Sequence, residues 1–297
     1  MDITIVIPIY NRKDYIRKTL ESIDEKYPLI LVDNGSTDGS FELCSEIVSQ
    51  RKHTILVTEP KPGAAAARNK GLSMCQTRWV YFFDSDDIFT GRPISWNVDS
   101  DMVFFPTCID VNGQLRTRDY QVPAAPHVHI LNSMLNTQGM IFRTEFLRDL
   151  GGWNESCLLW DDWELGLRVL LHHAKADYVT KQPYHVISLH SDSITGDSLS
   201  SRADRIITTM GIAFDDIFNS AVEGKERQKA FAALFYRCYI LSGKMLMEGN
   251  AESSAKIDAF IYDRFRVNRQ SHMMGQMLRW ATAKGGRGVW RIALRIV

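Results

Sequence analysis

Trp79-Val80-Tyr81-Phe82-Phe83-Asp84-Ser85-Asp86-Asp87 is the stretch that decides how this chain is expected to fold. Five apolar residues lead directly into three carboxylates, which is typical of a buried strand that ends in a polar loop. Clustered negative charges repel one another, and a cation offsets that repulsion. Carboxylate oxygens suit Mg²⁺ or Mn²⁺, which keep positions open for substrate phosphates. The stretch therefore favours a metal site for diphosphate chemistry, with a strand and a solvated acidic turn as the alternative.

Upstream of this stretch, apolar β-branched runs alternate with amphipathic helical segments. Such alternation is typical of parallel strands covered by helices on both faces. Asn11 is expected to cap the first helix. The expected strands are 3–9, 29–32, 53–58 and 79–83, and the expected helices contain 16–23, 41–47 and 64–74. We predict an α/β fold with a Rossmann-like, mostly parallel sheet flanked by helices.

Downstream of the acidic cluster the pattern changes. The run 102–106 and the Asn112-Gly113 turn favour a hairpin, so the sheet is expected to become mixed. A further strand is expected at 139–142, a helix at 161–174, and mostly helices from about residue 201, with 230–247 the longest. Asp99-Ser100-Asp101 repeats the acidic triplet before its apolar run instead of after it. Because ligands bind beyond the carboxyl ends of strands, we assign no metal to this second triplet.

The composition of the 297 residues indicates a globular protein, with 45% hydrophobic residues and a formal net charge of zero. Zero net charge argues against a general nucleic-acid binder. The charge is uneven, however, because residues 264–297 contain eight Lys or Arg and no Asp or Glu. Five scattered cysteines without metal spacing indicate reduced thiols, and no run of apolar residues is long enough to span a bilayer. We expect a cytoplasmic protein without a signal peptide.

Eight segments together resemble the inverting glycosyltransferases of family 2, which have the GT-A fold. They are IVIPIYNR, VDNGSTDGS, PGAAAARNKGL, WVYFFDSDD, GMIFR, GGWNES, WDDWELGLR and HSDSIT, and they cover roughly residues 3–195. Their order and spacing are specific, whereas the Rossmann and P-loop glycine motifs are absent. The resemblance implies a catalytic domain over 1–200, with a nucleotide-sugar half (1–95) and an acceptor half (96–200). A helical region over 201–297 would follow.

The resemblance also implies which residues bind the donor, a nucleotide-diphosphate sugar with a UDP-sugar favoured. Asp33 would accept a hydrogen bond from the base, although a turn role for Asp33 is the alternative. Arg68 would lie near the diphosphate, although a solvated helix charge is the alternative. In the acidic cluster, Asp84 would contact ribose or a metal-bound water. The implied donor-binding residues are Pro8, Tyr10, Asn11, Arg12, Asp33, Arg68, Asp84 and Ser85.

A divalent cation, Mn²⁺ or Mg²⁺, is implied as cofactor. It would bridge the two phosphates and stabilise the charge on the leaving nucleoside diphosphate. Asp86 would coordinate it directly, with Asp84 and Asp87 in support. His190 is implied as a further ligand or a diphosphate contact, with a structural hydrogen bond as the alternative.

Trp160-Asp161-Asp162-Trp163-Glu164 matches the acidic acceptor motif of the family. Asp162 is expected to be the base that takes a proton from the acceptor hydroxyl, because Asp161 and Glu164 have the spacing of a capping box. Both aspartates are retained as catalytic candidates, although both could merely favour the helix dipole. Trp160 and Trp163 would stack on the acceptor sugar. Glu164 and Arg168 are expected to form a surface ion pair.

The basic tail, 270–297, is predicted to be amphipathic. Its apolar stripe is expected to contain Met273, Met274, Met277, Leu278 and Ala281, followed by Trp290, Ile292 and Leu294. A basic amphipathic helix with tryptophan favours peripheral contact with the inner face of a membrane. The alternative is that the stripe packs on the same chain or on a second protomer in a homodimer.

The leading functional hypothesis is metal-dependent, inverting transfer of a sugar to a hydroxyl of a glycan, which could be lipid-linked, in surface polysaccharide biosynthesis. A sugar-phosphate nucleotidyltransferase is an alternative enzyme, although its Gly-rich, Arg- and Lys-bearing loop is missing after Ile9. A non-catalytic glycan- or nucleotide-binding module is the third hypothesis. The residues do not identify the sugar or the acceptor.

Overall fold

The computed structural model describes all residues except 1, 91–98, 112, 119–124, 180–182 and 189–197. The chain divides into two compact units. The first contains Met1–Val122, Leu135–Ser156 and Ala174–His190, and the second contains Pro123–Met134, Cys157–His173 and Ser191–Val297. This division differs from the expected boundary near residue 200, because two helices from the middle of the chain pack with the C-terminal helices.

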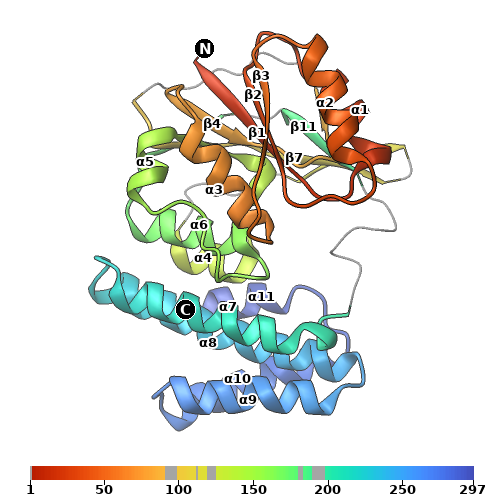
Figure 1. Cartoon of the computed structure of the whole chain (residues 1–297). Helices are drawn as coiled ribbons and strands as arrows, with labels where there is room; N and C mark the ends of the chain where they lie inside the picture. The colour runs from red at the N-terminus through yellow and green to blue at the C-terminus, as the bar shows by residue number, and fades with distance from the viewer. Residues whose placement is uncertain (1, 91–98, 112, 119–124, 180–182, 189–197) are drawn as a thin grey trace. The chain divides into compact units, whose positions relative to one another are not determined.

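The first unit is built on a seven-stranded mixed sheet with the strand order β10-β6-β9-β4-β1-β2-β3. Four of these strands, β1 to β4, are labelled in Figure 1. Its strands are β1 (Ile3–Ile9), β2 (Leu29–Asp33), β3 (Thr54–Thr58), β4 (Trp79–Phe82), β6 (Met102–Phe104), β9 (Met140–Arg143) and β10 (Ala176–Tyr178). The pairs β1–β2, β2–β3 and β1–β4 are parallel, and β9 runs antiparallel to β4 and β6. The predicted mostly parallel sheet that becomes mixed is confirmed.

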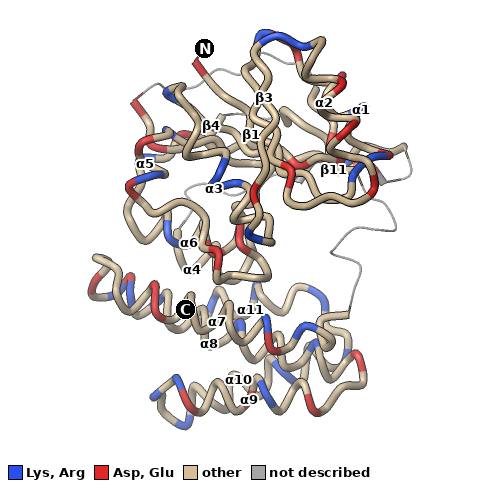
Figure 2. Tube along the Cα trace, in the orientation of Figure 1, with Lys and Arg blue, Asp and Glu red and all other residues tan. Residues whose placement is uncertain are grey.

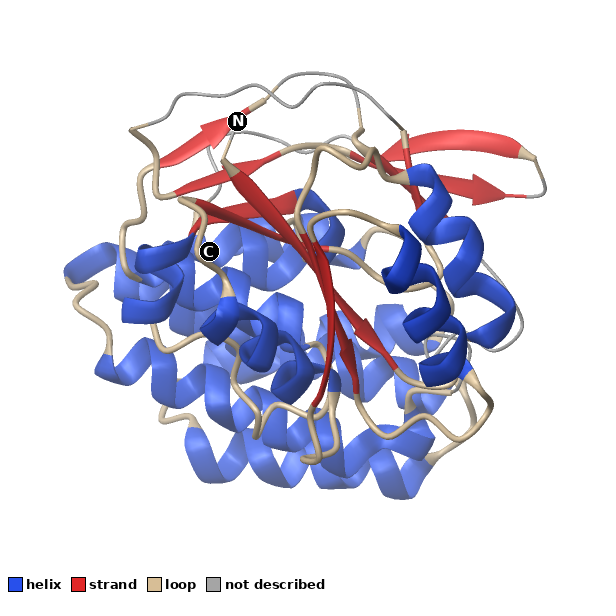
Figure 3. Ribbon diagram, turned by 45° about the horizontal axis from the view of Figure 1, so that its top comes forward, coloured by secondary structure: helices blue, strands red, loops and turns tan. Residues whose placement is uncertain are grey.

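Helices cover both faces of this sheet (Figure 3). The helices of the first unit are α1 (Lys13–Ser22), α2 (Ser40–Gln50), α3 (Ala64–Met74) and α5 (Thr144–Asp149), and a 3-10 turn, Thr137–Gly139, precedes β9. On β1, Ile5 and Ile7 pack in one core cluster with Ile16 of α1. Val6 points to the other face, where a Cβ on Gly71 of α3 would lie 2.2 Å from its Cγ1. The glycine therefore lets α3 lie directly against β1.

A smaller sheet with the order β5-β11-β7-β8 completes the first unit. Its strands are β5 (Ile88–Phe89), β7 (Thr107–Val111), β8 (Gln114–Arg118) and β11 (His185–Ser188). The strands β7 and β8 pair antiparallel with Val111 opposite Gln114, so a hairpin is confirmed at the predicted place, but its strands are β7 and β8 and do not include the predicted run 102–106. The hairpin belongs to this smaller sheet, and not to the sheet that contains β6.

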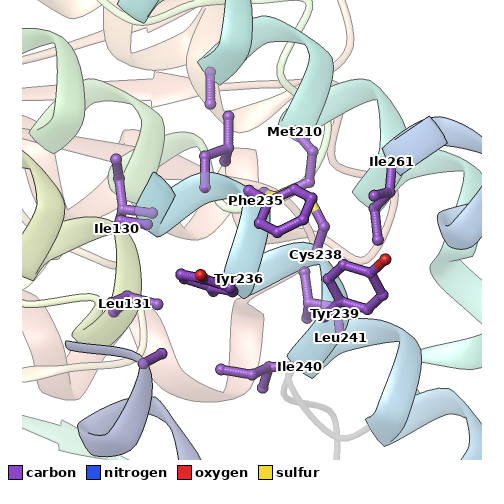
Figure 4. Close-up of a cluster of buried hydrophobic side chains, with 14 of the residues drawn as sticks. Ile130, Leu131, Met210, Phe235, Tyr236, Cys238, Tyr239, Ile240, Leu241 and Ile261 are labelled. Atoms are coloured by element: carbon purple, nitrogen blue, oxygen red, sulfur yellow. The ribbon is translucent and has the colours of Figure 1, made fainter. Parts of the chain in front are cut away.

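The second unit is helical. It contains α4 (Pro126–Asn132), α6 (Asp161–Leu171), α7 (Ala203–Asn219), α8 (Gly224–Met247), α9 (Ala251–Arg264), α10 (Arg269–Ala283), α11 (Val289–Ile296) and the 3-10 turn Ser200–Arg202. Its core gathers around α8, where Phe235 and Tyr239 are buried with residues of neighbouring helices (Figure 4). Small residues allow α8 and α10 to approach closely, since a Cβ on Gly275 would lie 2.2 Å from the Tyr239 ring.

The apolar stripe expected for the basic tail is largely covered within the second unit. Met274, Leu278 and Ala281 of α10 pack against the core cluster, as do Trp290 and Leu294 of α11. The alternative that the stripe packs on the same chain is therefore correct for these residues, whereas Met273, Met277 and Ile292 are exposed. Among the described helices, none is both long and apolar enough for a membrane span. The five cysteines are buried free thiols.

Candidate active site

The carboxyl ends of β1, β2 and β4 lie at one edge of the main sheet, because these strands are parallel. Asn11 joins the first two loops at this edge. Its Oδ1 accepts a hydrogen bond from the backbone N of Thr37 (2.8 Å), and its backbone N donates to the Ser36 hydroxyl (3.1 Å). The cap prediction for Asn11 is wrong: α1 begins at Lys13, and Asn11 has a left-handed φ of 51°. Its side chain bridges loops instead.

Asp33 ends β2 and is 4% exposed. Its Oδ2 accepts hydrogen bonds from the backbone N of Gly35 (3.1 Å) and of Ser36 (3.2 Å), which fixes the turn. Its Oδ1 is buried and has no hydrogen-bond partner among the described residues. An unpaired buried acceptor is costly, so this oxygen is a suitable partner for a donor group on a ligand.

Asn34 holds the loop that follows β3. Its amide nitrogen donates to the carbonyls of Glu59 and Lys61, both at 2.8 Å, and its Oδ1 accepts from the backbone N of Gly63 at 2.8 Å. All of these bonds are internal, so Asn34 connects the β2 and β3 loops.

Asp84 is held from two sides. Arg68, whose side chain is 7% exposed, donates to Asp84 Oδ1 (3.1 Å) and lies over the Trp153 ring, 4.4 Å from its centroid. Gln138 donates to Asp84 Oδ2 at 2.5 Å. The charge pair with the buried Arg68 and the amide of Gln138 together fix the direction of this carboxylate. Arg68 is therefore a buried partner of Asp84, and the alternative of a solvated helix charge is wrong.

Arg12 forms an ion pair with Asp86, with 3.2 Å between Nε and Oδ2. Both side chains are about one-fifth exposed, at 20% and 18%. Tyr10, by contrast, is 59% exposed, and Pro8 is half-buried. Ser85 is buried, and its carbonyl accepts a hydrogen bond from the Thr19 hydroxyl (3.0 Å). The first and fourth loops are thus linked by a charge pair at the sheet edge.

Asp87 points into the protein and is 2% exposed. Its Oδ1 accepts from the backbone N of Ser188 (3.0 Å), and its Oδ2 lies 3.5 Å from Nε2 of His185. The other ring nitrogen of His185 is hydrogen-bonded to the Tyr81 hydroxyl (2.6 Å). Burial and the charge of Asp84 raise the pKa of Asp87, while burial lowers the pKa of His185 to about 3. Asp87 therefore anchors β11 to the acidic loop.

The carboxylates of the acidic loop differ in how well they are placed to bind a divalent cation. Across the described ranges, no group of three or more His, Cys, Asp or Glu side chains is placed to hold a metal. Mg²⁺, however, is commonly bound through one or two carboxylates together with substrate phosphates. Asp84 and Asp86 are partly exposed and fit that arrangement, whereas Asp87 is directed away from solvent. His190 lies outside the described residues.

The acidic motif of the second unit begins α6. Trp160 precedes the helix with a left-handed φ of 59°, which is strained for a bulky side chain. Asp161 Oδ1 accepts from the backbone N of Asp162 (3.0 Å), and Asp162 Oδ1 accepts from that of Trp163 (2.7 Å). Both carboxylates are half-buried in the first turn, where the helix dipole favours negative charge.

The predicted ion pair between Glu164 and Arg168 is confirmed, but Glu164 is fully buried, so the pair does not lie on the surface. The predicted capping box of Asp161 with Glu164 is wrong, because Trp160 is the N-cap residue. The physical reason is the turn of the helix, which directs Glu164 toward α7. Burial and the charge of Glu164 raise the pKa of Asp216 on α7 to about 7. The fully buried Glu164 and the half-buried Asp216 therefore form an acidic pair next to Arg168.

The two tryptophans of the motif lie around a half-buried arginine of α8. The guanidinium of Arg237 lies 5.1 Å from the Trp160 ring and 4.6 Å from the Trp163 ring, and it donates to the carbonyl of Ile130 (2.6 Å). Trp163 is 2% exposed and also stacks on His129. A buried ring has no face for a sugar, so the expected acceptor contact of Trp163 is withdrawn. Trp160 is half-buried and stays a prediction.

Sequence reasoning missed three supporting residues, namely Asn34, Gln138 and His185. Gln138 directly precedes the GMIFR segment, and His185 begins β11. The sequence around Gln138 and His185 does not identify them as supporting residues, because their partners are distant in the chain. Asp84 is 54 positions from Gln138, and Asp87 is 98 positions from His185.

Comparison with known proteins confirms the resemblance. Residues 4–95 match the family described as glycosyl transferase family 2. The putative teichuronic acid biosynthesis glycosyltransferase TuaG of Bacillus subtilis is 41% identical over 91 residues, which are 29% of this chain and 36% of that protein. The chain thus covers about a third of the length of this relative.

Solved structures confirm the fold. TarS of S. aureus, residues 1–349 in complex with UDP-GlcNAc, matches with a TM-score of 0.70 at 17% identity, over 99% of this chain and 90% of that one. A mannosyltransferase of Pyrobaculum calidifontis in complex with GDP-Man and Mn²⁺ matches with a TM-score of 0.57 at 15% identity, over 99% and 86% of the two chains. The mixed sheet with flanking helices and the helical C-terminal region is the predicted GT-A type of fold.

Proposed function

We propose that this chain is a glycosyltransferase that moves a sugar from a nucleotide-diphosphate donor, with a UDP-sugar favoured, to a hydroxyl of a saccharide. The observation that carries the proposal is the buried Oδ1 of Asp33, which has no partner among the described residues and lies at the sheet edge that also presents Asp84 and Asp86. The family match over 4–95 and the likeness to TarS with UDP-GlcNAc support it.

Each loop at this edge has a proposed task in donor binding. The Asp33 oxygen accepts the N–H of a pyrimidine or guanine base, a donor that a fixed carboxylate recognises. The exposed ring of Tyr10 is available to stack on the base, beside Pro8. Asp84, fixed by Arg68 and Gln138, presents its carboxylate to the ribose or to a metal-bound water.

Mn²⁺ or Mg²⁺ is the proposed cofactor, held by Asp86 together with Asp84. When bound, the cation supplies stabilisation of the charge that develops on the leaving nucleoside diphosphate. Arg12 adds a second positive charge at Asp86, in reach of the same region. Asp87 holds the acidic loop in position through Ser188 and His185 and is not proposed as a direct ligand.

Asp162 is the proposed base that removes the proton of the acceptor hydroxyl during a single inverting displacement, with Asp161 as its neighbour. The strained backbone of Trp160, immediately before these carboxylates, supports a functional role for the turn. Trp160 is the proposed acceptor contact. Transfer to a surface polysaccharide, on an acceptor that could be lipid-linked, is proposed from the similarity to TuaG, a putative teichuronic acid biosynthesis glycosyltransferase.

The test is a panel of nucleotide sugars, each incubated with the chain in the presence of Mn²⁺ or of a chelator. One sugar nucleotide should be hydrolysed to nucleoside diphosphate in a Mn²⁺-dependent way. Release of pyrophosphate instead would show a nucleotidyltransferase.

A matched pair of variants then tests the base. Asp162→Asn should lower turnover by about 10²–10⁴-fold while donor affinity measured by calorimetry is retained, and Asp161→Asn should lower it less. Full turnover in Asp162→Asn would remove the assignment.

A further inference from the structure

The outer face of α10 carries a row of exposed apolar side chains. Met273 is 58% exposed, Met277 is 61% exposed and Trp280 is 66% exposed. At 100° per residue, these positions and the cations Arg269 and Lys284 fall within an arc of about 80° on one side of the helix. This row, from Arg269 to Lys284, is here called the outer α10 stripe.

The opposite side of α10 packs against the core of the second unit. Leu278 and Met274 pack on the core cluster, and Gly275 lies against Tyr239 of α8. The fold of the second unit therefore fixes α10 with its outer stripe turned away from the core. Exposed hydrophobic residues are ordinary when scattered, but an aligned row of two methionines and a tryptophan indicates a binding surface.

Charge identifies the partner. The stripe has a cation at each end, and residues 264–297 contain Lys and Arg but no Asp or Glu, as Figure 2 shows along α10 and α11. Arg291 and Arg295 are exposed on α11. A helix with apolar residues flanked by cations fits the boundary between headgroups and acyl chains of an anionic bilayer, where tryptophan is favoured and cations reach the lipid phosphates.

A second copy of the chain fits this face poorly. An antiparallel pair of stripes would place Arg269 of one protomer opposite Lys284 of the other, and a parallel pair would place each cation opposite itself. Both arrangements bring like charges together. Three apolar side chains also supply much less than the roughly 800 Å² per partner that a stable interface buries.

We propose that the outer α10 stripe docks the protein on an anionic membrane surface, with α10 lying in the plane of the headgroups. This inference goes beyond the proposed transferase activity and does not depend on it. Met273 and Met277 belong to the stripe predicted for the basic tail, whereas Trp280 does not, and Trp290 and Leu294 of the predicted stripe are partly buried against the core.

The experiment is co-sedimentation of the full chain with vesicles of phosphatidylcholine alone or of an equimolar mixture with phosphatidylglycerol. The wild type should bind the anionic vesicles and release at high salt. Met277→Ser with Trp280→Ser should lower the partition coefficient about tenfold or more, because the variant lacks two apolar side chains that become buried when the protein docks on the membrane. Arg269→Gln with Lys284→Gln should lower it about 25-fold, at about fivefold for each cation.

Phe218→Ser is the matched control, because Phe218 lies in α7 and is equally exposed at 63%. It should bind like the wild type, and circular dichroism should show all variants folded. Equal binding to neutral vesicles, or unchanged binding of the Met277/Trp280 variant, overturns the proposal. A wild-type dimer in light scattering that Trp280→Ser converts to a monomer also overturns it and assigns the face to a second copy. None of these readouts uses transferase activity.

Discussion

Replacement of Asp33 by asparagine tests the proposed donor site at its most specific atom. The change keeps the size of the side chain and leaves an oxygen for the backbone N–H groups of Gly35 and Ser36. It removes the charge of the buried oxygen that is proposed to accept from the base. Because Asp33 is 4% exposed, water cannot replace the lost interaction.

The magnitude follows from the kind of bond. A hydrogen bond to a charged group contributes about 1.5–3 kcal/mol, so the Kd for UDP should rise by about 10- to 150-fold. The assay is calorimetric titration with UDP and with CDP at constant Mn²⁺. Cytosine has an acceptor where uracil has an N–H, so the wild type should prefer UDP, and the amide introduced by Asp33→Asn should narrow that preference.

Asp38→Asn is the control for Asp33→Asn. Asp38 lies in the same loop and accepts from the backbone N of Lys13 (3.0 Å) and of Ser40 (2.9 Å), but it has no proposed ligand contact. Its replacement should affect stability and not the Kd. A change of less than about twofold in Asp33→Asn, or an equal loss in both variants, would refute the assignment of the base to Asp33.

Three further outcomes are expected. Asp86→Asn should make UDP-sugar affinity equal with and without Mn²⁺, and a retained difference in calorimetry would contradict the metal role. The pKa of Asp216 is raised to about 7 from 3.8 by burial and by the charge of Glu164, so the folded chain holds a proton that the unfolded chain releases. The contribution of Asp216 to stability is then complete below about pH 4 and is lost as the pH rises through 7. In Asp216→Asn, the decrease of Tm between pH 5 and 8 should be smaller than in the wild type. An equal decrease of Tm in both proteins would argue against the raised pKa of Asp216. Gly275→Ala gains helix propensity but places a Cβ 2.2 Å from the Tyr239 ring, so unfolding in urea should show a net loss of about 1–3 kcal/mol, whereas an unchanged midpoint would show that α10 shifts freely.

Local chemistry allowed the sequence to predict most of the first unit. Strands buried on both faces are continuous apolar runs, and the run 79–83 with its acidic end could be recognised without knowledge of its neighbours. Parallel order then placed Asp33, Asp84 and Asp86 at one edge, because strand–helix alternation brings carboxyl ends together. The second triplet, Asp99 to Asp101, was excluded by the same logic, and it does precede β6.

The predictions that were wrong concern side chains whose surroundings come from distant segments of the chain. The direction of Glu164 depends on where α7 packs, and the burial of Trp163 depends on Arg237, which is 74 positions away. Helical periodicity likewise predicts that α10 is amphipathic. It does not predict which side the core covers, because Met274 and Met277 are the same residue type on different sides of the helix.

The sequence by itself determined the sheet, its helices and the acidic edge, because hydrophobic period and turn chemistry are properties of neighbouring residues. Only the tertiary structure decided which carboxylate is buried, which tryptophan is exposed and which oxygen of Asp33 has no partner within the described chain. Burial and hydrogen-bond satisfaction depend on the surrounding atoms, and folding brings those atoms from distant parts of the chain.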